Sequence, residues 1–366
     1  MPAILNSTLG VTLSMAGCPN RCRHCYLGPP HPGRPTTDDL RWVVGQFRNY
    51  RRPRATQPLW SAINVVSWIW EPDFAPNYRE LYELENELSG LPSLRPGYEL
   101  LSIWRLARQP EYAEWAHSIG VRVCQMTFWG IEQATDWGFG RRGAFADLLA
   151  ATERLLAVGI RPRWQWMITK KMLPDLSRLI ELTGQLRLQA RCEQLGGPFT
   201  LFLNLPSPDG SGWAIEHLRL TAADSAQVPA WLQEQSEAHM GGSLGEPEGK
   251  LVKELWNEEK PAATTTADIT GRLFLLVMPN FDVYPNLGEM LPPWRLGNLK
   301  TDGLDAIIAN FEQDRTPGQQ ALFHLPVAEL ARCFGRPSGQ RIFAHSDLKS
   351  RWLKQWLHEH SSYAKA

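Results

Sequence analysis

The sequence predicts an α/β protein built on parallel strands, followed by a smaller α+β segment. Strand-like and helix-like segments alternate through the first two thirds of the 366 residues, and this alternation stops near residue 240. Most of the strands are apolar on both faces, as expected where crossover helices cover both sides of a parallel sheet. With 43% hydrophobic and 21% charged residues, the composition is that of a globular chain with a sizeable core.

Six strand–helix units follow one another in the first 240 residues. Strands are expected where β-branched and aromatic residues cluster, at 10–16, 62–70, 98–104, 121–128, 160–168 and 199–205. Helices are expected where apolar residues recur at helical spacing, at 37–47, 78–88, 111–119, 145–156, 176–186 and 221–237. Helix caps are indicated by Thr36 with Asp39, Thr221 with Asp224, Gly90, Gly120 and Gly159. This pattern fits an open doubly wound sheet and a barrel equally well.

The segment after residue 240 has a different pattern. A glycine-rich linker is expected at 241–249 and a β-hairpin at 273–284, with Pro279-Asn280-Phe281 as its turn. Short helices are expected at 304–311 and 347–358. We therefore divide the chain into a core, residues 1–240, and an extension, residues 241–366.

The balanced net charge and the absence of long apolar runs argue against a nucleic-acid-binding protein and a membrane protein. Because 38 Lys and Arg balance 38 Asp and Glu, no general attraction to nucleic acid or anionic membrane is expected. The one dense basic run, residues 48–54, is interpreted as a solvated helix end and loop. No apolar run approaches the ~20 residues needed to span a bilayer. Residues 1–17 lack the basic start of a signal peptide, so a cytoplasmic location is expected.

Three cysteines form the strongest motif. Cys18, Cys22 and Cys25 have the spacing C-x3-C-x2-C directly after the first expected strand. Three thiolates in one loop can hold three irons of a [4Fe–4S] cluster, which leaves the fourth iron open to an external amine and carboxylate. The alternatives are a zinc site completed by His24 or His31, and chance. Zinc sites usually contain paired cysteines, and no second C-x2-C is present, so the cluster is favoured.

The sequence CPNRCRHCY at residues 18–26 follows the first strand of a βα series. It resembles the cysteine motif of the radical S-adenosylmethionine (SAM) enzymes. The resemblance implies a partial (β/α)6 barrel of the TIM type, with a small α+β C-terminal extension. It also implies that the [4Fe–4S] cluster binds SAM and, with an electron from a carrier such as flavodoxin or ferredoxin, cleaves it. The resulting 5′-deoxyadenosyl radical abstracts hydrogen from a substrate.

Further segments resemble the SAM-contacting motifs of that family. The family has Gly-Gly-Glu-Pro after its second strand; here Glu71 and Pro72 match, whereas Ile69 and Trp70 replace the glycines. The resemblance implies that Glu71 holds the SAM amino group. It implies further contacts near the adenine, at the ribose or carboxylate, and from an arginine; these fall on His24, on Thr127, and on Arg141 or Arg142. No residue is assigned to hydrogen transfer.

The extension resembles SPASM-type extensions, which usually bind auxiliary iron–sulfur clusters. The likeness lies in residues 279–286 and 295–299, but Asn286 stands at a cysteine position and no cysteine occurs between residues 193 and 332. We therefore expect a lid and substrate shelf without metal. SPASM-like extensions favour a ribosomal peptide as substrate. A sugar, nucleoside or amino acid is the alternative, followed by a non-catalytic zinc module.

Tryptophan is unusually frequent, with 16 residues. Six of them fall in or just after expected strands: Trp68, Trp70, Trp104, Trp129, Trp164 and Trp166. Each fits core packing, and as a group they also suggest an aromatic cavity that excludes water.

Overall fold

The computed structural model describes residues 8–265 and 273–360. Its strands are β1 (Thr8–Leu13), β2 (Ala62–Val66), β3 (Val123–Phe128), β4 (Arg161–Met167), β5 (Thr200–Asn204), β6 (Glu246–Pro247), β7 (Phe274–Val277), β8 (Asp282–Pro285), β9 (Gly297–Asn298) and β10 (Ile342–Phe343). Its α-helices are α1 (Thr37–Asn49), α2 (Tyr78–Ser89), α3 (Arg95–Tyr98), α4 (Ile103–Leu106), α5 (Pro110–Ser118), α6 (Glu132–Phe139), α7 (Ala144–Val158), α8 (Leu176–Gln185), α9 (Leu188–Gln194), α10 (Ala222–Ser225), α11 (Ala230–Met240), α12 (Glu248–Leu255), α13 (Gly303–Glu312), α14 (Pro317–His324), α15 (Val327–Phe334) and α16 (His345–His360).

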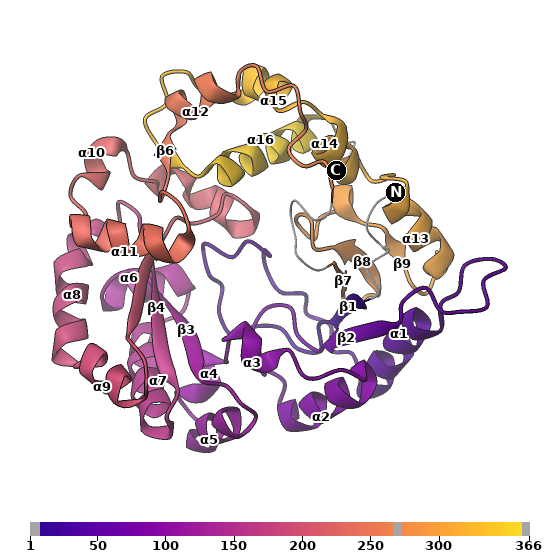
Figure 1. Cartoon of the computed structure of the whole chain (residues 1–366), viewed down its shortest axis with the longest axis horizontal. Helices are drawn as coiled ribbons and strands as arrows, with labels where there is room; N and C mark the ends of the chain where they lie inside the picture. Colours follow the sequence, from indigo (N-terminus) through magenta and orange to yellow (C-terminus); the bar gives the residue numbers. More distant parts are fainter. Residues whose placement is uncertain (1–7, 266–272, 361–366) are drawn as a thin grey trace.

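The parallel strands fall into two sheets. One has the order β2-β1-β7-β8-β9, with β1 parallel to both β2 and β7; the other is the parallel sheet β3-β4-β5. The helices lie mainly along the outer rim, and α12, α14, α15 and α16 lie along the upper edge (Figure 1). The mixed α/β class is confirmed. No closed barrel forms among the described residues, so the predicted partial (β/α)6 barrel is not confirmed.

The prediction of a third strand at 98–104 is wrong. These residues include the end of α3, which carries a proline in its first turn, and the start of α4, which is capped by Ser102. The free edge of β2 is satisfied by side chains instead of a strand. Ser89 Oγ accepts from the Val65 amide at 2.9 Å, and the Glu85 carboxylate accepts from the Ser67 amide at 2.6 Å. Side chains of α2 thus take the hydrogen bonds that a third strand would have made.

Two smaller predictions also need correction. The helix expected at 221–237 is two helices, α10 and α11, with Pro229 at the cap of the second. The linker expected at 241–249 ends early, because Glu246–Pro247 pairs with β10 and α12 begins at Glu248. The predicted hairpin is confirmed as β7 and β8, and the capping boxes at Thr36 and Thr221 are both formed.

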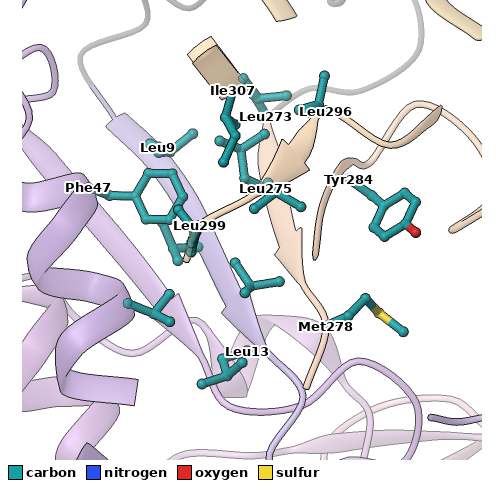
Figure 2. Close-up of a cluster of buried hydrophobic side chains, with 14 of the residues drawn as sticks. Leu9, Leu13, Phe47, Leu273, Leu275, Met278, Tyr284, Leu296, Leu299 and Ile307 are labelled. Atoms are coloured by element: carbon teal, nitrogen blue, oxygen red, sulfur yellow. The ribbon is translucent and has the colours of Figure 1, made fainter. Parts of the chain in front are cut away.

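The hairpin of the extension shares a core with the start of the chain. β7 pairs with β1, and the buried cluster between them contains residues from β1, α1, β7, β8 and α13. Figure 2 shows Leu9 and Phe47 close to Leu275 and Ile307 in this cluster. Among the described residues, no helix is long and apolar enough to cross a membrane.

Removing the Ser89 hydroxyl is expected to destabilise the sheet edge. In Ser89→Ala the buried Val65 amide loses its partner, and an unsatisfied buried donor costs at least about 1 kcal/mol. The free energy of unfolding from urea titration measures this loss. Ser118→Ala is the matched control, since its exposed hydroxyl bonds only to its own helix. Equal stability of the two variants would contradict the role given to Ser89.

Candidate functional site: the cysteine loop and its surroundings

The loop with the three cysteines follows β1 and is held first by the end of α6. The Arg21 amide donates to the Phe139 carbonyl at 2.9 Å, and the Arg23 amide donates to the Gly138 carbonyl at 2.8 Å. At residue 140 only glycine fits, because a Cβ atom would lie 2.5 Å from the Arg21 carbonyl oxygen. This first clamp therefore uses main-chain atoms and leaves the cysteine side chains free of it.

A second clamp holds the other end of the loop. The Ser211 amide donates to the Cys25 carbonyl at 2.8 Å, and a Cβ atom at Gly210 would overlap the same oxygen. Residues 209–211 are held by α16 through two contacts. Ser350 Oγ donates to Asp209 at 2.5 Å. Lys354 pairs with Glu289, and Glu289 accepts a hydrogen bond from the Gly210 amide. The C-terminal helix thus supports the cysteine loop, an arrangement without a local sequence signal.

The three thiols influence one another electrostatically. Burial, followed by the nearby Glu71 carboxylate, raises the pKa of Cys18 to about 12. Burial also raises the pKa of Cys22, with further contributions from Cys18 and Cys25. Buried thiols of raised pKa become thiolates when a cationic centre binds them. Their donor chemistry fits an iron–sulfur cluster, in which each cysteine ligates a different iron.

Glu71 lies at the edge of this loop. Its Oε2 atom is 3.9 Å from Cys18 Sγ, and its Oε1 atom accepts from Ser102 Oγ at 2.8 Å. Burial raises the pKa of this carboxyl to about 7, although the bond from Ser102 acts in the opposite direction. The site therefore holds a poorly solvated carboxyl that a bound cation would stabilise. Ser102 was not singled out from the sequence, since its only local signal is that of a helix cap.

Trp70 stands beside Glu71, where the resemblance to the family leads one to expect a glycine. Its indole Nε1 donates to the Gly28 carbonyl at 3.0 Å, which ties the segment after β2 to the cysteine loop. Gly28 itself donates to the Cys25 carbonyl at 3.0 Å. Trp70 thus ties the segment that carries Glu71 to the cysteine loop through a side-chain hydrogen bond.

Replacing Trp70 by phenylalanine tests this tie. Trp70→Phe removes one hydrogen bond worth about 0.5–1.5 kcal/mol, so the SAM binding expected at Glu71 from the family resemblance should weaken by less than about tenfold. Calorimetric titration with SAM measures the change. Trp256→Phe is the control, because its side chain is partly exposed and directly follows α12, in the extension. Equal affinities in both variants would mean that Trp70 only packs.

His24, between the second and third cysteines, is fixed by Trp129. The Trp129 Nε1 donates to His24 Nδ1 at 3.1 Å, and the two ring centroids are 5.3 Å apart. Burial lowers the pKa of His24 to about 4, so the ring is neutral at pH 7. With Nδ1 accepting, the remaining proton is on Nε2. His24 thus forms a neutral, oriented wall beside the loop.

The structure separates the two candidate arginines. Arg141 donates from Nε to Asn20 Oδ1 at 2.7 Å and pairs with Asp147 at 2.7 Å. It also acts electrostatically on Glu71 and Cys22, lowering the pKa of each against the effect of burial. Arg142 is exposed. Only Arg141 is therefore brought together with the cysteines and Glu71.

Thr127 belongs to a polar row on β3 and β4. Its hydroxyl donates to Gln165 Oε1 at 3.2 Å, and Gln125 Nε2 donates to the same oxygen at 2.9 Å. Thr127 and Gln165 are register partners in the parallel sheet. These bonds hold Thr127 within its own sheet, so its expected role as a ligand contact stays a prediction.

Comparison with known proteins gives a match at the level of structure. Neither protein-family models nor curated proteins match the chain. The solved structure of native anSMEcpe with bound AdoMet and Cp18Cys peptide has a TM-score of 0.50 at 12% identity, covering 96% of this chain and 97% of that chain. The chain has the fold of the radical SAM enzymes. An affinity-tagged form of anSMEcpe with bound AdoMet gives the same TM-score and identity, covering 96% and 93%. Streptococcus suis SuiB bound to precursor peptide SuiA gives 0.39 at 13%, covering 75% and 58%.

Within this radical SAM fold, a cavity of about 1280 Å³ opens beside the cysteine loop. Tyr26 and Leu27, directly after Cys25, form part of its wall, and Trp68 forms another part. The extension supplies much of the remainder, from residues 286–294 and 346–359. In the described part of the chain, no group of three or more His, Cys, Asp and Glu side chains is arranged to hold a metal ion, and this includes the three cysteines of the loop.

The six tryptophans do not form one aromatic cavity. Trp164 and Trp166 are completely buried in the core around β3–β5, and Trp164 packs on Phe128 and Phe199. Of the six, only Trp68 lines the cavity beside the cysteine loop. Core packing explains the strand tryptophans of β4, and the cavity takes its other aromatic side chains from Tyr26, Tyr98, Trp213, Phe274 and Trp294.

Proposed function

We propose that the chain is a radical SAM enzyme whose [4Fe–4S] cluster is held by Cys18, Cys22 and Cys25. The observation that carries this proposal is the clamped loop, which presents three interacting thiols beside Glu71 within a radical SAM fold. When bound, the cluster supplies the electron that cleaves SAM to methionine and a 5′-deoxyadenosyl radical, which takes a hydrogen atom from the substrate.

The surrounding residues would bind and orient SAM. Glu71, held by Ser102, accepts hydrogen bonds from the SAM amino group, and Arg141, held by Asn20 and Asp147, pairs with the SAM carboxylate. Of the two arginines proposed from the sequence, the role goes to Arg141 because Arg142 is exposed. The neutral ring of His24 would lie near the adenine, and Thr127 would contact the ribose or the carboxylate of SAM.

The proposed substrate is a ribosomal peptide. The cavity of about 1280 Å³ begins directly after Cys25 and is lined by aromatic and aliphatic side chains, with charged groups on α16. Such a wall suits an extended segment that carries apolar side chains. A structure of the same fold, anSMEcpe, contains the Cp18Cys peptide.

The proposed location is the cytoplasm. None of the six cysteines forms a disulfide bond, which suits a reducing compartment.

The extension would act as lid and shelf without a second cluster. Asn286, at the position of a SPASM cysteine, accepts from the Phe274 amide at 2.9 Å and so closes the hairpin. Asp282 binds Arg295 at 2.7 Å and Asn298 at 3.0 Å, which joins β8 to β9 and the segment before it. Hydrogen bonds and an ion pair thus hold this region together, where a SPASM extension would use metal ligands.

Iron analysis tests the proposed function. After anaerobic reconstitution we expect a brown protein with violet absorbance and about four irons per chain, since one cluster has three cysteine ligands and one open iron. A colourless protein containing zinc would refute the proposal in favour of the binding-module alternative. An iron content of about eight per chain that falls when Cys192 or Cys333 is replaced would instead show a second cluster, bound by Cys192 of the core or by Cys333 of the extension.

A further inference from the structure

Four exposed cationic residues surround the outer side of the cysteine loop. Arg21 and Arg23 belong to the loop itself, Arg142 follows α6, and Lys171 follows β4. Arg23 and Lys171 both lie over the Trp137 ring, at 4.7 and 4.9 Å from its centroid. We call these four residues the basic face.

Three acids near the basic face are engaged elsewhere, whereas Glu132, at the start of α6, is exposed. Asp136 accepts from the Gly143 and Phe145 amides, which caps α7, and Asp147 pairs with Arg108 and Arg141. Asp175 pairs with Arg178 and accepts from the Ile131 amide. No salt bridge to the basic face occurs among the residues that the structure describes. Because the whole chain is neutral, this positive surface is a local feature.

The basic face is connected to the cysteine loop through two ring contacts. Trp137 meets Trp129 edge to face, with centroids 5.6 Å apart. Trp129 donates to His24, which lies between Cys22 and Cys25. A protein that docks on Trp137 is therefore close to the cysteines and does not need to enter the cavity lined by Tyr26 and α16.

We propose that the basic face is the docking site of an acidic protein that carries single electrons. The inference rests on the proposed function, because each SAM cleavage consumes one electron that the chain does not generate. The carrier loses this electron, the cluster would pass it to SAM, and it ends in the new lone pair of the methionine sulfur, while the other electron of the broken carbon–sulfur bond stays on the 5′ carbon. Charge complementarity at such a surface raises the association rate and falls off with salt.

Charge reversal on the basic face tests the proposal against a matched control. The test variant is Arg142→Glu with Lys171→Glu, and Arg142→Gln with Lys171→Gln is its milder form. The control is Arg48→Glu with Arg51→Glu, which makes the same charge change in exposed residues at the end of α1 and in the loop after it. That loop projects from the edge beside α13, on the opposite side of the molecule from α6 (Figure 1).

Two measurements are needed. The first is calorimetric binding of oxidised flavodoxin to the metal-free chain at low salt. The second is SAM cleavage by the reconstituted chain, driven by reduced flavodoxin or by dithionite, which needs no protein docking site. We expect the glutamate variant to bind flavodoxin and to turn over with it about tenfold less well, the glutamine variant to lie between, and the control to match the wild type. Dithionite-driven cleavage should be unchanged, and the difference should shrink between about 0.05 and 0.5 M salt.

Several outcomes would overturn the docking site. These are equal flavodoxin binding in the test and control variants, or an equal loss of dithionite-driven cleavage, which would indicate damage to the site. Binding of single-stranded RNA that depends on Arg142 and Lys171, without flavodoxin binding, would assign the face to a nucleic acid. A wild type that binds flavodoxin but assembles no cluster would refute the proposed function while leaving the surface interaction in place.

Discussion

Replacing Cys18, Cys22 and Cys25 together by alanine is expected to abolish iron binding and SAM cleavage and to leave the fold intact. An alanine methyl group cannot ligate iron, so no cluster forms. The loop itself should persist, because both of its clamps are made by main-chain groups, at Arg21 and Arg23 on one side and at the Cys25 carbonyl on the other. Iron content, SAM cleavage under anaerobic reducing conditions and circular dichroism measure the three parts of this result.

The control for the triple variant is Cys333→Ala. Cys333 is exposed and lies in α15, outside the cysteine loop, so its loss should change neither iron content nor SAM cleavage. SAM cleavage that persists in the triple variant would refute the assignment of the cluster. Loss of the folded state in the triple variant would show instead that the thiols stabilise the loop by packing.

Local patterns predicted much of the fold because the physics behind them is local. The capping boxes at Thr36 and Thr221 formed as expected, since each depends on residues three apart. The third strand failed for the opposite reason. Its apolar and aromatic residues suit a strand, but Ser89 and Glu85 of α2 already satisfy the edge of β2, and this contact is not visible in the spacing of residues 98–104.

In the candidate site, too, local sequence patterns were predictable and contacts between distant segments were not. The spacing of Cys18, Cys22 and Cys25 is a local signal, so the loop was predictable. The contact of Trp70 with Gly28 and the support of Asp209 by Ser350 of α16 join segments 42 and 141 residues apart. The substitution of tryptophan for glycine was visible in the sequence, but only the fold shows that the indole makes a hydrogen bond in place of the open backbone.

Replacing Glu71 by glutamine is expected to weaken SAM binding about 10–100-fold. A charge-assisted hydrogen bond contributes about 1.5–3 kcal/mol, and glutamine keeps the size of the side chain and an oxygen for Ser102 while it removes the charge. The effect should be large because the carboxyl is poorly solvated, as its raised pKa of about 7 indicates, so hydrogen bonds from the SAM amino group supply stabilisation that water does not.

Titration of SAM into the reduced protein, followed by the EPR signal of the cluster, measures this affinity. Iron content should stay at the wild-type level, since Glu71 is not one of the three cysteine ligands. Glu83→Gln is the matched control, because Glu83 is an exposed carboxylate on α2 and its change should leave SAM affinity unaltered. Ser102→Ala should have a smaller effect than Glu71→Gln, because it loosens the carboxylate without removing its charge. An unchanged affinity in Glu71→Gln would mean that the Trp70 tie turns the carboxylate away from SAM, and that Arg141 and its partners hold the ligand without it.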